Sequence, residues 1–214
     1  MDGTMTMNRL IHQAVRRDLD RLARSMSSYG GTQPGRAKGL ERAYANLQRE
    51  LTRHHESEDE LIWPMLAQLG VDQQLLSTME SEHQDMSDAL QETGAAMKAF
   101  ASSGSATALG PARESLKRTR VVVERHLDHE ERELEPLLIP HFESEEWKEV
   151  ERKLRKEPPK VAGQFFAWLT DGMSDEGRSY LKSTVPRPVV SILGHVFGRR
   201  YHKNIAPVWH AGVA

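Results

Sequence analysis

Two copies of a short motif place a histidine and a glutamate four residues apart. His54 and Glu58 form the first HxxxE copy, and His126 and Glu130 form the second. Residues at i and i+4 project from the same face of an α-helix, so each pair can hold one cation or bridge two. Neutral imidazole and ionised carboxylate are both metal ligands in proteins. The motif therefore indicates a metal site built on two helices.

The two copies belong to an internal repeat. Both are followed by proline at the same offset, in HHESEDELIWP and HLDHEERELEP, and they lie 72 residues apart. A lone histidine precedes each copy, His12 in the first half and His83 in the second, and these two are 71 residues apart. Each half thus contributes one histidine and one HxxxE pair, as expected for a repeated pair of helices.

These six polar residues interrupt apolar stripes. The first HxxxE pair continues, in steps of three and four, the stripe that ends at Leu51, and the second pair continues the stripe that ends at Val123. His83 follows Met79 in the same way, and His12 lies beside the apolar face of the first predicted helix. Burying unpaired ions costs several kcal/mol each. We therefore favour a shared cation over a hydrogen-bond network without metal.

Two further histidines are predicted to lie outside the ligand set. His55 follows His54 and is turned away from it by about 100° on a helix. His129 lies three residues after His126. We expect both either to contact the ligands from outside or to lie at the surface. Four flanking acidic residues are expected to be solvated, although one of them could accept a hydrogen bond from a ligand: Asp59, Glu60, Glu131 and Glu133.

Helical periodicity dominates the chain, and no stretch alternates with the period of two that is typical of a strand. Four long amphipathic segments are separated by breakers, among them the Gly- and Ser-rich stretch 101–111. Pro64 and Gly70 are expected to end the second helix. The pattern predicts an all-α protein in which residues 1–141 form an antiparallel up-down-up-down four-helix bundle. The shorter helices of residues 142–214 are expected to pack on it as an extension.

Composition excludes several other kinds of site and partner. The 214 residues include no cysteine, which excludes disulfides, iron–sulfur clusters and thiolate zinc sites. The 29 Lys and Arg residues nearly balance the 31 Asp and Glu residues, so no overall basic charge would attract nucleic acid or an acidic membrane. The N-terminal residues lack the pattern of a signal peptide, and the apolar stretch PVVSILGHVFG is too short to cross a bilayer. We expect a soluble, cytoplasmic protein without nucleic-acid or membrane partners.

The order His, HxxxE, His, HxxxE on four helices resembles the hemerythrin family of HHE cation-binding proteins, over roughly residues 8–141. The resemblance implies a non-haem di-iron centre inside an up-down-up-down bundle. His12 and His54 would ligate one iron, and His83 and His126 would ligate the other. The two glutamates of the motifs would bridge the irons, and an oxo or hydroxo group would complete the bridge.

One position departs from the oxygen-carrying members of that family, which have a second histidine one turn after the one on the third helix. Here that position is Ser87, a poor iron ligand. Two octahedral irons offer about twelve positions, of which the residues above and the bridge fill about ten. The ending GRRYHK resembles that of many actinobacterial hemerythrin-like proteins, and a phenolate is a good donor to ferric iron. We predict that Tyr201 fills one vacancy, with Tyr180 as an alternative to it and ordinary core packing as an alternative role for Tyr201.

Two functions of different kinds follow from this interpretation. The first is a di-iron protein that binds or reduces a small oxidant, namely O2, peroxide or nitric oxide. The vacancies favour a peroxide-decomposing enzyme or a redox sensor over simple carriage of O2. The second is an iron-responsive regulatory or iron-storage module without turnover, in which folding depends on the metal and the extension contacts a partner.

Overall fold

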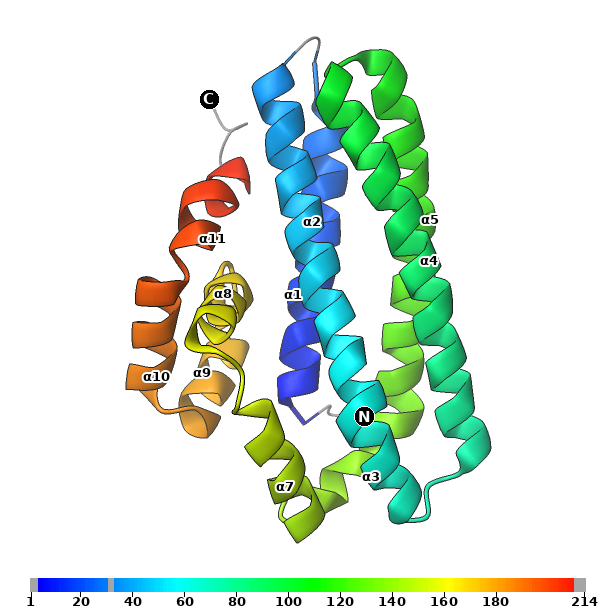
Figure 1. Cartoon of the computed structure of the whole chain (residues 1–214), viewed down its shortest axis with the longest axis vertical. Coiled ribbons are helices and arrows are strands. Elements are labelled where there is room, and N and C mark those ends of the chain that lie inside the picture. Colours follow the sequence, from blue (N-terminus) through cyan, green and yellow to red (C-terminus); the bar gives the residue numbers. More distant parts are fainter. Residues whose placement is uncertain (1–3, 31–32, 210–214) are drawn as a thin grey trace.

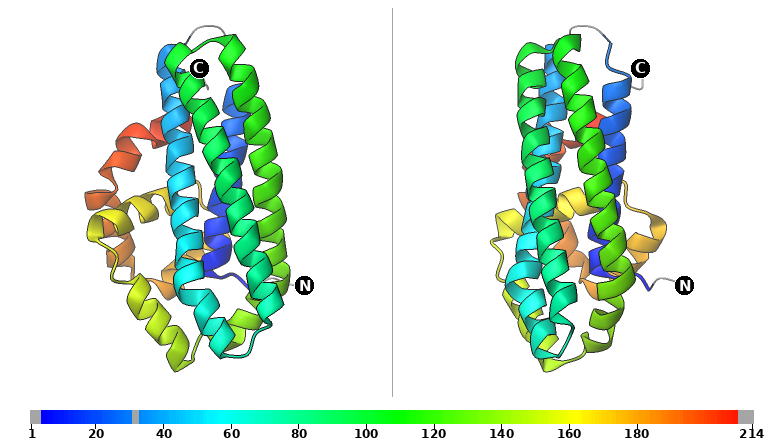
Figure 2. Two further views of the ribbon diagram at one scale, coloured as in Figure 1. Left: turned by 45° about the vertical axis from the view of Figure 1, so that its right-hand side comes forward. Right: turned by 90° about the vertical axis from the view of Figure 1, so that its right-hand side faces the viewer.

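The computed structural model describes residues 4–30 and 33–209, and every regular element in this part of the chain is a helix. The prediction of an all-α protein is therefore confirmed for these residues. Four long helices lie side by side and run along the length of the molecule (Figures 1 and 2). They are α1 (Met7–Ser27), α2 (Pro34–Ser57), α4 (Gln73–Ser103) and α5 (Ala106–His129). Contacts join α1 to α2 and α5, and α4 to α2 and α5, so the four helices enclose a common core.

Capping residues explain where three of these helices begin. Thr6 precedes α1, and its hydroxyl accepts a hydrogen bond from the backbone N–H of Arg9. The carboxylate of Asp72 caps α4, and the hydroxyl of Ser105 caps α5. Each side chain satisfies a backbone donor that lacks a partner within its helix. Helix α4 ends at Gly104, whose φ of 61° is a left-handed conformation that favours glycine.

The two helices that carry the HxxxE motifs continue beyond the glutamate through a wider, π-helical turn. Segment η1 (Glu58–Ile62) leads into α3 (Trp63–Gln68). Segment η2 (Glu130–Leu134) leads in the same way into α6 (Glu135–Leu138), which the short 3-10 turn η3 (Ile139–His141) follows. The helix therefore passes through Pro64, the first of its two predicted breakers, and ends at Gln68, just before the second, Gly70.

The proline provides a physical reason for the wider turn. Pro64 has no backbone N–H, and in a regular helix its ring would clash with the carbonyl group of residue 60. In η1 the N–H of Trp63 instead bonds the carbonyl oxygen of Glu58, five residues back. Pro136 occupies the same place after η2, where the N–H of Glu135 bonds the carbonyl oxygen of Glu130.

Apolar side chains of the four long helices form the main core. These residues are fully buried and recur at helical spacing: Val15, Leu19, Leu22, Met26, Leu40, Leu47, Leu51, Met86, Met97, Phe100 and Val123. A second, smaller cluster lies at the α3 end and includes Trp63, Leu66, Leu76, Met79 and Leu134. The polar residues identified from the sequence belong to the helix turns between these two apolar regions.

The chain after His141 folds into shorter helices beside α1 and α2 (Figure 1). They are α7 (Glu145–Leu154), α8 (Pro159–Thr170), α9 (Asp175–Thr184), α10 (Arg187–Ile192), the π-helical η4 (Leu193–Phe197), α11 (Arg199–Asn204) and the 3-10 turn η5 (Ala206–Trp209). Helix α8 is fixed to α1 by the indole of Trp168, which donates to the buried carboxylate of Asp18 over 2.8 Å. None of the helices in the described residues has the length and apolarity that crossing a bilayer requires.

Candidate metal centre

Seven imidazole and carboxylate side chains converge between the four long helices. They are His12 from α1, His54 and His55 from the end of α2, Glu58 from η1, His83 from α4, His126 from α5 and Glu130 from η2. Six of them are buried, and the side chain of His54 is 9% exposed. All six residues that the sequence predicted as ligands thus lie near one another, and His55 lies among them.

Each glutamate lies between histidines from two different helices. The Oε1 atom of Glu58 is 3.2 Å from Nε2 of His54, and its Oε2 atom is 3.6 Å from Nε2 of His83. The Oε2 atom of Glu130 is 3.2 Å from Nε2 of His12 and 3.9 Å from Nε2 of His126. Glu58 thus offers one oxygen to each of its two histidines, whereas Glu130 offers Oε2 to both and its Oε1 accepts from Asn8.

Carboxylates outside the cluster orient three of the imidazole rings. The Nδ1 atom of His12 lies 2.8 Å from Glu131, and that of His83 lies 2.8 Å from Asp59. A carboxylate can only accept, so each of these Nδ1 atoms carries the proton and donates it. The Nε2 atom of each ring then faces the cluster, and in the neutral ring its lone pair is free there, as in the tautomer that binds a metal.

Glu82 orients the histidine of the second HxxxE motif, His126, in the same way. It accepts from Nδ1 of His126 over 2.9 Å and from Nδ1 of His129 over 3.0 Å. Burial alone would raise the pKa of Glu82, but these hydrogen bonds lower it below its usual range, so the group is ionised. His129 therefore lies beside the cluster and not in it, as the sequence predicted. The sequence allowed one of the four flanking acidic residues to contact the site, and two of them, Asp59 and Glu131, contact histidines of the cluster. Their shared offset, one residue after each motif glutamate, is the signal that could have identified them.

Several buried atoms of the cluster have no hydrogen-bond partner. They are Nε2 of His55, His83 and His126 and Oε2 of Glu58 and Glu130, and all five belong to the described part of the chain. Leaving a buried polar atom unsatisfied costs about 1–3 kcal/mol. Bound cations would satisfy these five atoms, so the donor set fits a metal site.

The ionisation of the cluster also suits a metal. Burial lowers the pKa of His54 to about 3 and that of His126 to about 4, so both are neutral at neutral pH. Burial together with the charge of Glu130 raises the pKa of Glu58. Burial alone would lower the pKa of His12, but contact with Glu130 and Glu131 raises it above its ordinary value. A cation would displace the protons that these raised pKa values retain.

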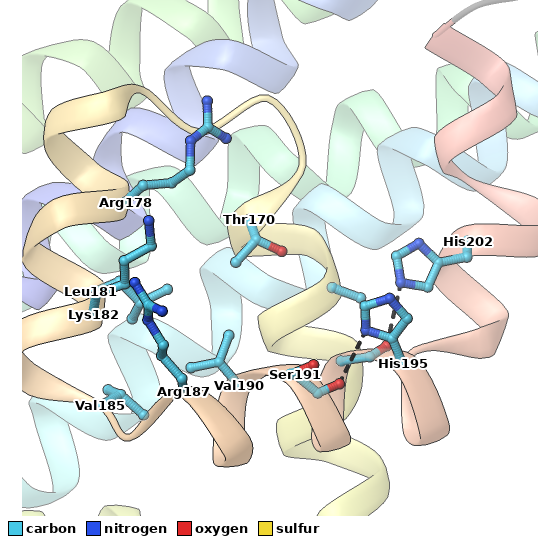
Figure 3. Close-up of a pocket in the computed structure, with 12 residues that line it drawn as sticks. Thr170, Arg178, Leu181, Lys182, Val185, Arg187, Val190, Ser191, His195 and His202 are labelled. Atoms are coloured by element: carbon cyan, nitrogen blue, oxygen red, sulfur yellow. Dashed lines mark hydrogen bonds between the residues drawn. The ribbon is translucent and has the colours of Figure 1, made fainter.

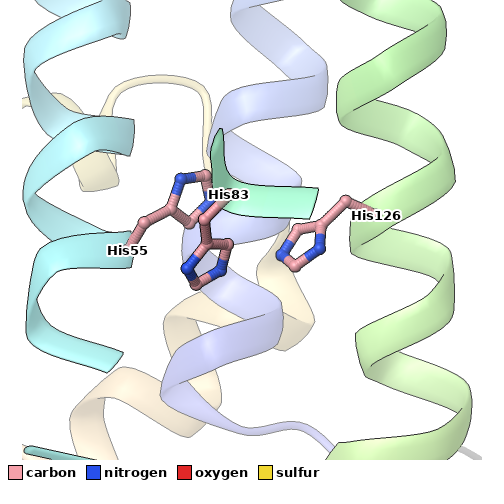
Figure 4. Close-up of side chains that lie close together, drawn as sticks. All are labelled: His55, His83 and His126. Atoms are coloured by element: carbon pink, nitrogen blue, oxygen red, sulfur yellow. The ribbon is translucent and has the colours of Figure 1, made fainter. Parts of the chain in front are cut away.

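The donor atoms form groups that overlap but have two distinct ends. One group joins His12, His54 and Glu130, and another joins His55, His83 and His126; within each, the donor atoms lie within 4.8 Å of one another. A third group, His54, His55 and Glu58, connects them. Figure 4 shows the rings of His55, His83 and His126 converging from α2, α4 and α5. The arrangement offers two neighbouring cation positions.

His55 lies among the rings of the cluster, so of the two positions expected for it the surface one is wrong. Helix α2 lies between α1 and α4, so two of its faces point into the protein. The turn of about 100° between successive residues directs His54 toward His12 of α1 and His55 toward α4. There the ring of His55 stacks on that of His83, with centroids 4.2 Å apart.

The position of Tyr201 agrees with its alternative role, ordinary core packing, and not with a place at the cluster. Its ring is fully buried, but its hydroxyl donates to Asp171 over 2.7 Å, and Asp171 pairs with Arg21 of α1. Arg21 lies nine residues from His12 along α1, which is about 13 Å. Tyr201 is thus part of the contact between the extension and α1 and is not brought to the histidines. Tyr180, the alternative, lies on α9 beside the start of α1.

A separate pocket lies on the extension. It has a volume of about 440 Å³, with Arg178, Lys182 and Arg187 on one side and His195 and His202 on the other (Figure 3). The ring of His195 contacts the backbone oxygen of residue 191, and the ring of His202 contacts that of residue 194. These two histidines belong to this surface and do not extend the metal cluster.

Comparison with known protein families agrees with the geometry. The model of the hemerythrin HHE cation-binding domain matches residues 7–138, which include the whole cluster. No curated protein and no solved structure matches the chain. The match covers more than half of the chain and both HxxxE motifs, and the protein therefore belongs to the hemerythrin HHE cation-binding domain family.

Proposed function

We propose that this protein binds two iron ions in an up-down-up-down bundle formed by α1, α2, α4 and α5. His12 and His54 would hold one ion, and His83 and His126 the other. Glu58 and Glu130 would bridge the two ions, together with an oxo or hydroxo group. The observation that carries the proposal is the set of buried donor atoms without partners, because three imidazole nitrogens and two carboxylate oxygens of the cluster lack any hydrogen-bond partner there.

The residues around the cluster support this function. Asp59, Glu82 and Glu131 fix the tautomers of three ligand histidines, so that little reorganisation is needed when metal binds. Trp63 stacks on the ring of His83 with centroids 5.8 Å apart, and its burial shields that side of the cluster from water. Bound iron would supply redox chemistry toward a small oxidant, namely O2, peroxide or nitric oxide.

Two measurements test the proposal. Metal analysis after anaerobic loading with Fe(II) should give two iron atoms per chain, and one atom or none would overturn the di-iron assignment. The iron-loaded protein should then decompose hydrogen peroxide faster than an equal amount of free iron. If two irons bind but peroxide is not consumed, the iron-storage or regulatory function is favoured.

A further inference from the structure

His55 has the properties of a metal ligand rather than of a structural histidine. Its side chain is buried, and its Nε2 atom has no hydrogen-bond partner among the described residues. Buried polar side-chain atoms are normally hydrogen-bonded, so an unpaired ring nitrogen requires an explanation. The ring stacks on His83 and meets His126 edge-on, with centroids 5.4 Å apart. The three rings therefore come from three different helices and converge.

The distances match the size of one coordination sphere. Donor atoms of His55, His83 and His126 lie within 4.8 Å of one another. Bonds of about 2.1 Å from imidazole nitrogen to a metal place two nitrogens on opposite sides of the ion about 4.2 Å apart. Small side-chain rotations would therefore bring all three nitrogens onto one ion.

Helix α4 supplies no second histidine that could bind this ion in place of His55. The corresponding position is Ser87, whose hydroxyl accepts a hydrogen bond from Gln91 over 3.2 Å on the outer side of α4. If only the six residues predicted from the sequence bound metal, the ion near His83 and His126 would thus lack one protein ligand.

We propose that His55 is the third histidine ligand of the ion held by His83 and His126, supplied by α2 in place of the ligand that Ser87 cannot provide. This inference rests on the proposed two-metal function. Of the roughly two vacant positions on the pair of ions, His55 fills one and leaves about one for an exogenous small molecule.

The experiment replaces His55 by phenylalanine, which keeps an aromatic ring against His83 but has no donor atom. His195→Phe is the control, since His195 lies on the surface of the extension, where its ring contacts the backbone oxygen of residue 191, and not in the cluster. Both variants and the wild type are loaded with Co(II), whose paramagnetism shifts the N–H protons of bound imidazoles far outside the normal proton NMR range. Affinity for each metal is measured by chelator competition.

We expect the wild type to show a shifted signal for His55 in addition to those of the other four ligand histidines. His55→Phe should lose one signal and bind the second metal about 100-fold more weakly, because a direct ligand should contribute at least as much as the 10- to 100-fold typical of outer contacts. The control should match the wild type in both respects.

The possible failures are distinguishable. If the wild type binds two metals but shows only four shifted imidazole signals, His55 is not a ligand while the two-metal function stands. The conclusion is also that His55 is not a ligand if His55→Phe retains every shifted imidazole signal and the wild-type affinity for both metals. If the wild type does not bind two metals, both the function and this inference are overturned. The signal count on the wild type decides the matter even if His55→Phe fails to fold.

Discussion

Removal of the carboxylate at position 82 is expected to weaken metal binding without removing a ligand. Glu82 lies on α4 with its side chain 14% exposed, and it holds the Nδ1 protons of His126 and His129. This contact keeps the Nε2 lone pair of His126 directed at the cluster. In Glu82→Ala the imidazole of His126 is free to rotate or to take the other tautomer, and either change removes a donor atom from the site.

The size of the effect follows from the geometry. Loss of such an outer hydrogen bond typically weakens metal binding by about 10- to 100-fold, or about 1.4–2.8 kcal/mol. His126 is fully buried, and Nδ1 has no hydrogen-bond partner other than Glu82 among the described residues, so we expect the upper half of this range. Glu82→Gln retains an acceptor oxygen and should lose less than about tenfold.

The assay is an anaerobic competition titration of Fe(II) against a chelator of known affinity. Glu92→Ala is the matched control, because Glu92 lies on the same helix but is 63% exposed and pairs only with the surface residue Arg118. Circular dichroism should show unchanged helix content in all variants. If Glu82→Ala binds Fe(II) as tightly as Glu92→Ala, the carboxylate does not set the state of His126, and the argument for preset tautomers fails.

Four further outcomes are expected. Glu58→Ala should lower the iron content per chain because it removes a bridge, whereas replacement of the exposed Glu145 should not; equal iron contents would contradict the bridging role. Verified removal of iron should lower the melting temperature, since metal at 100 times its Kd stabilises the folded state by about 2.7 kcal/mol; an unchanged melting curve would indicate a self-sufficient hydrogen-bond network. Asp18→Ala should reduce the free energy of unfolding in urea by about 3–5 kcal/mol, because it leaves the Trp168 indole and Arg17 without their buried partner; a loss below about 1 kcal/mol would show that this contact does not hold the extension. Tyr201→Phe should cost about 1 kcal/mol through the lost hydrogen bond to Asp171 and leave iron content and visible spectrum unchanged; a changed spectrum would restore Tyr201 to the metal site.

Periodicity in the sequence was sufficient to find the helices and the residues that gather between them. A polar residue at a core position of a helix must meet either water or a partner, and six such residues at matched register implied one shared partner. The structure brings all six together. Whether they bind two irons stays a prediction for the loading experiment.

The sequence was less informative about His55 and Tyr201, because the apolar stripe of a single helix does not show every contact that the helix makes. A helix inside a bundle has two neighbours, so His54 and His55 can both point inward. Periodicity along a single face does not show this, and it left open a surface position for His55 that the structure excludes. Tyr201 was misplaced for a different reason, because its partner Asp171 lies 30 residues earlier on another helix and no local pattern links the two.

The prolines after the two motifs are best understood as part of the metal site. Each proline forces a wider turn that begins at the motif glutamate, in η1 and in η2. In such a turn successive side chains are rotated by less than in a regular helix, so the residue after the glutamate stays closer to the same face. Asp59 and Glu131 occupy that position and bind the Nδ1 atoms of His83 and His12. A regular helix would turn these carboxylates further away, and two ligand histidines would lose the contacts that set their tautomers. The matched spacing of HxxxE and proline therefore specifies both the glutamate of the cluster and the acidic residue that orients a histidine on another helix.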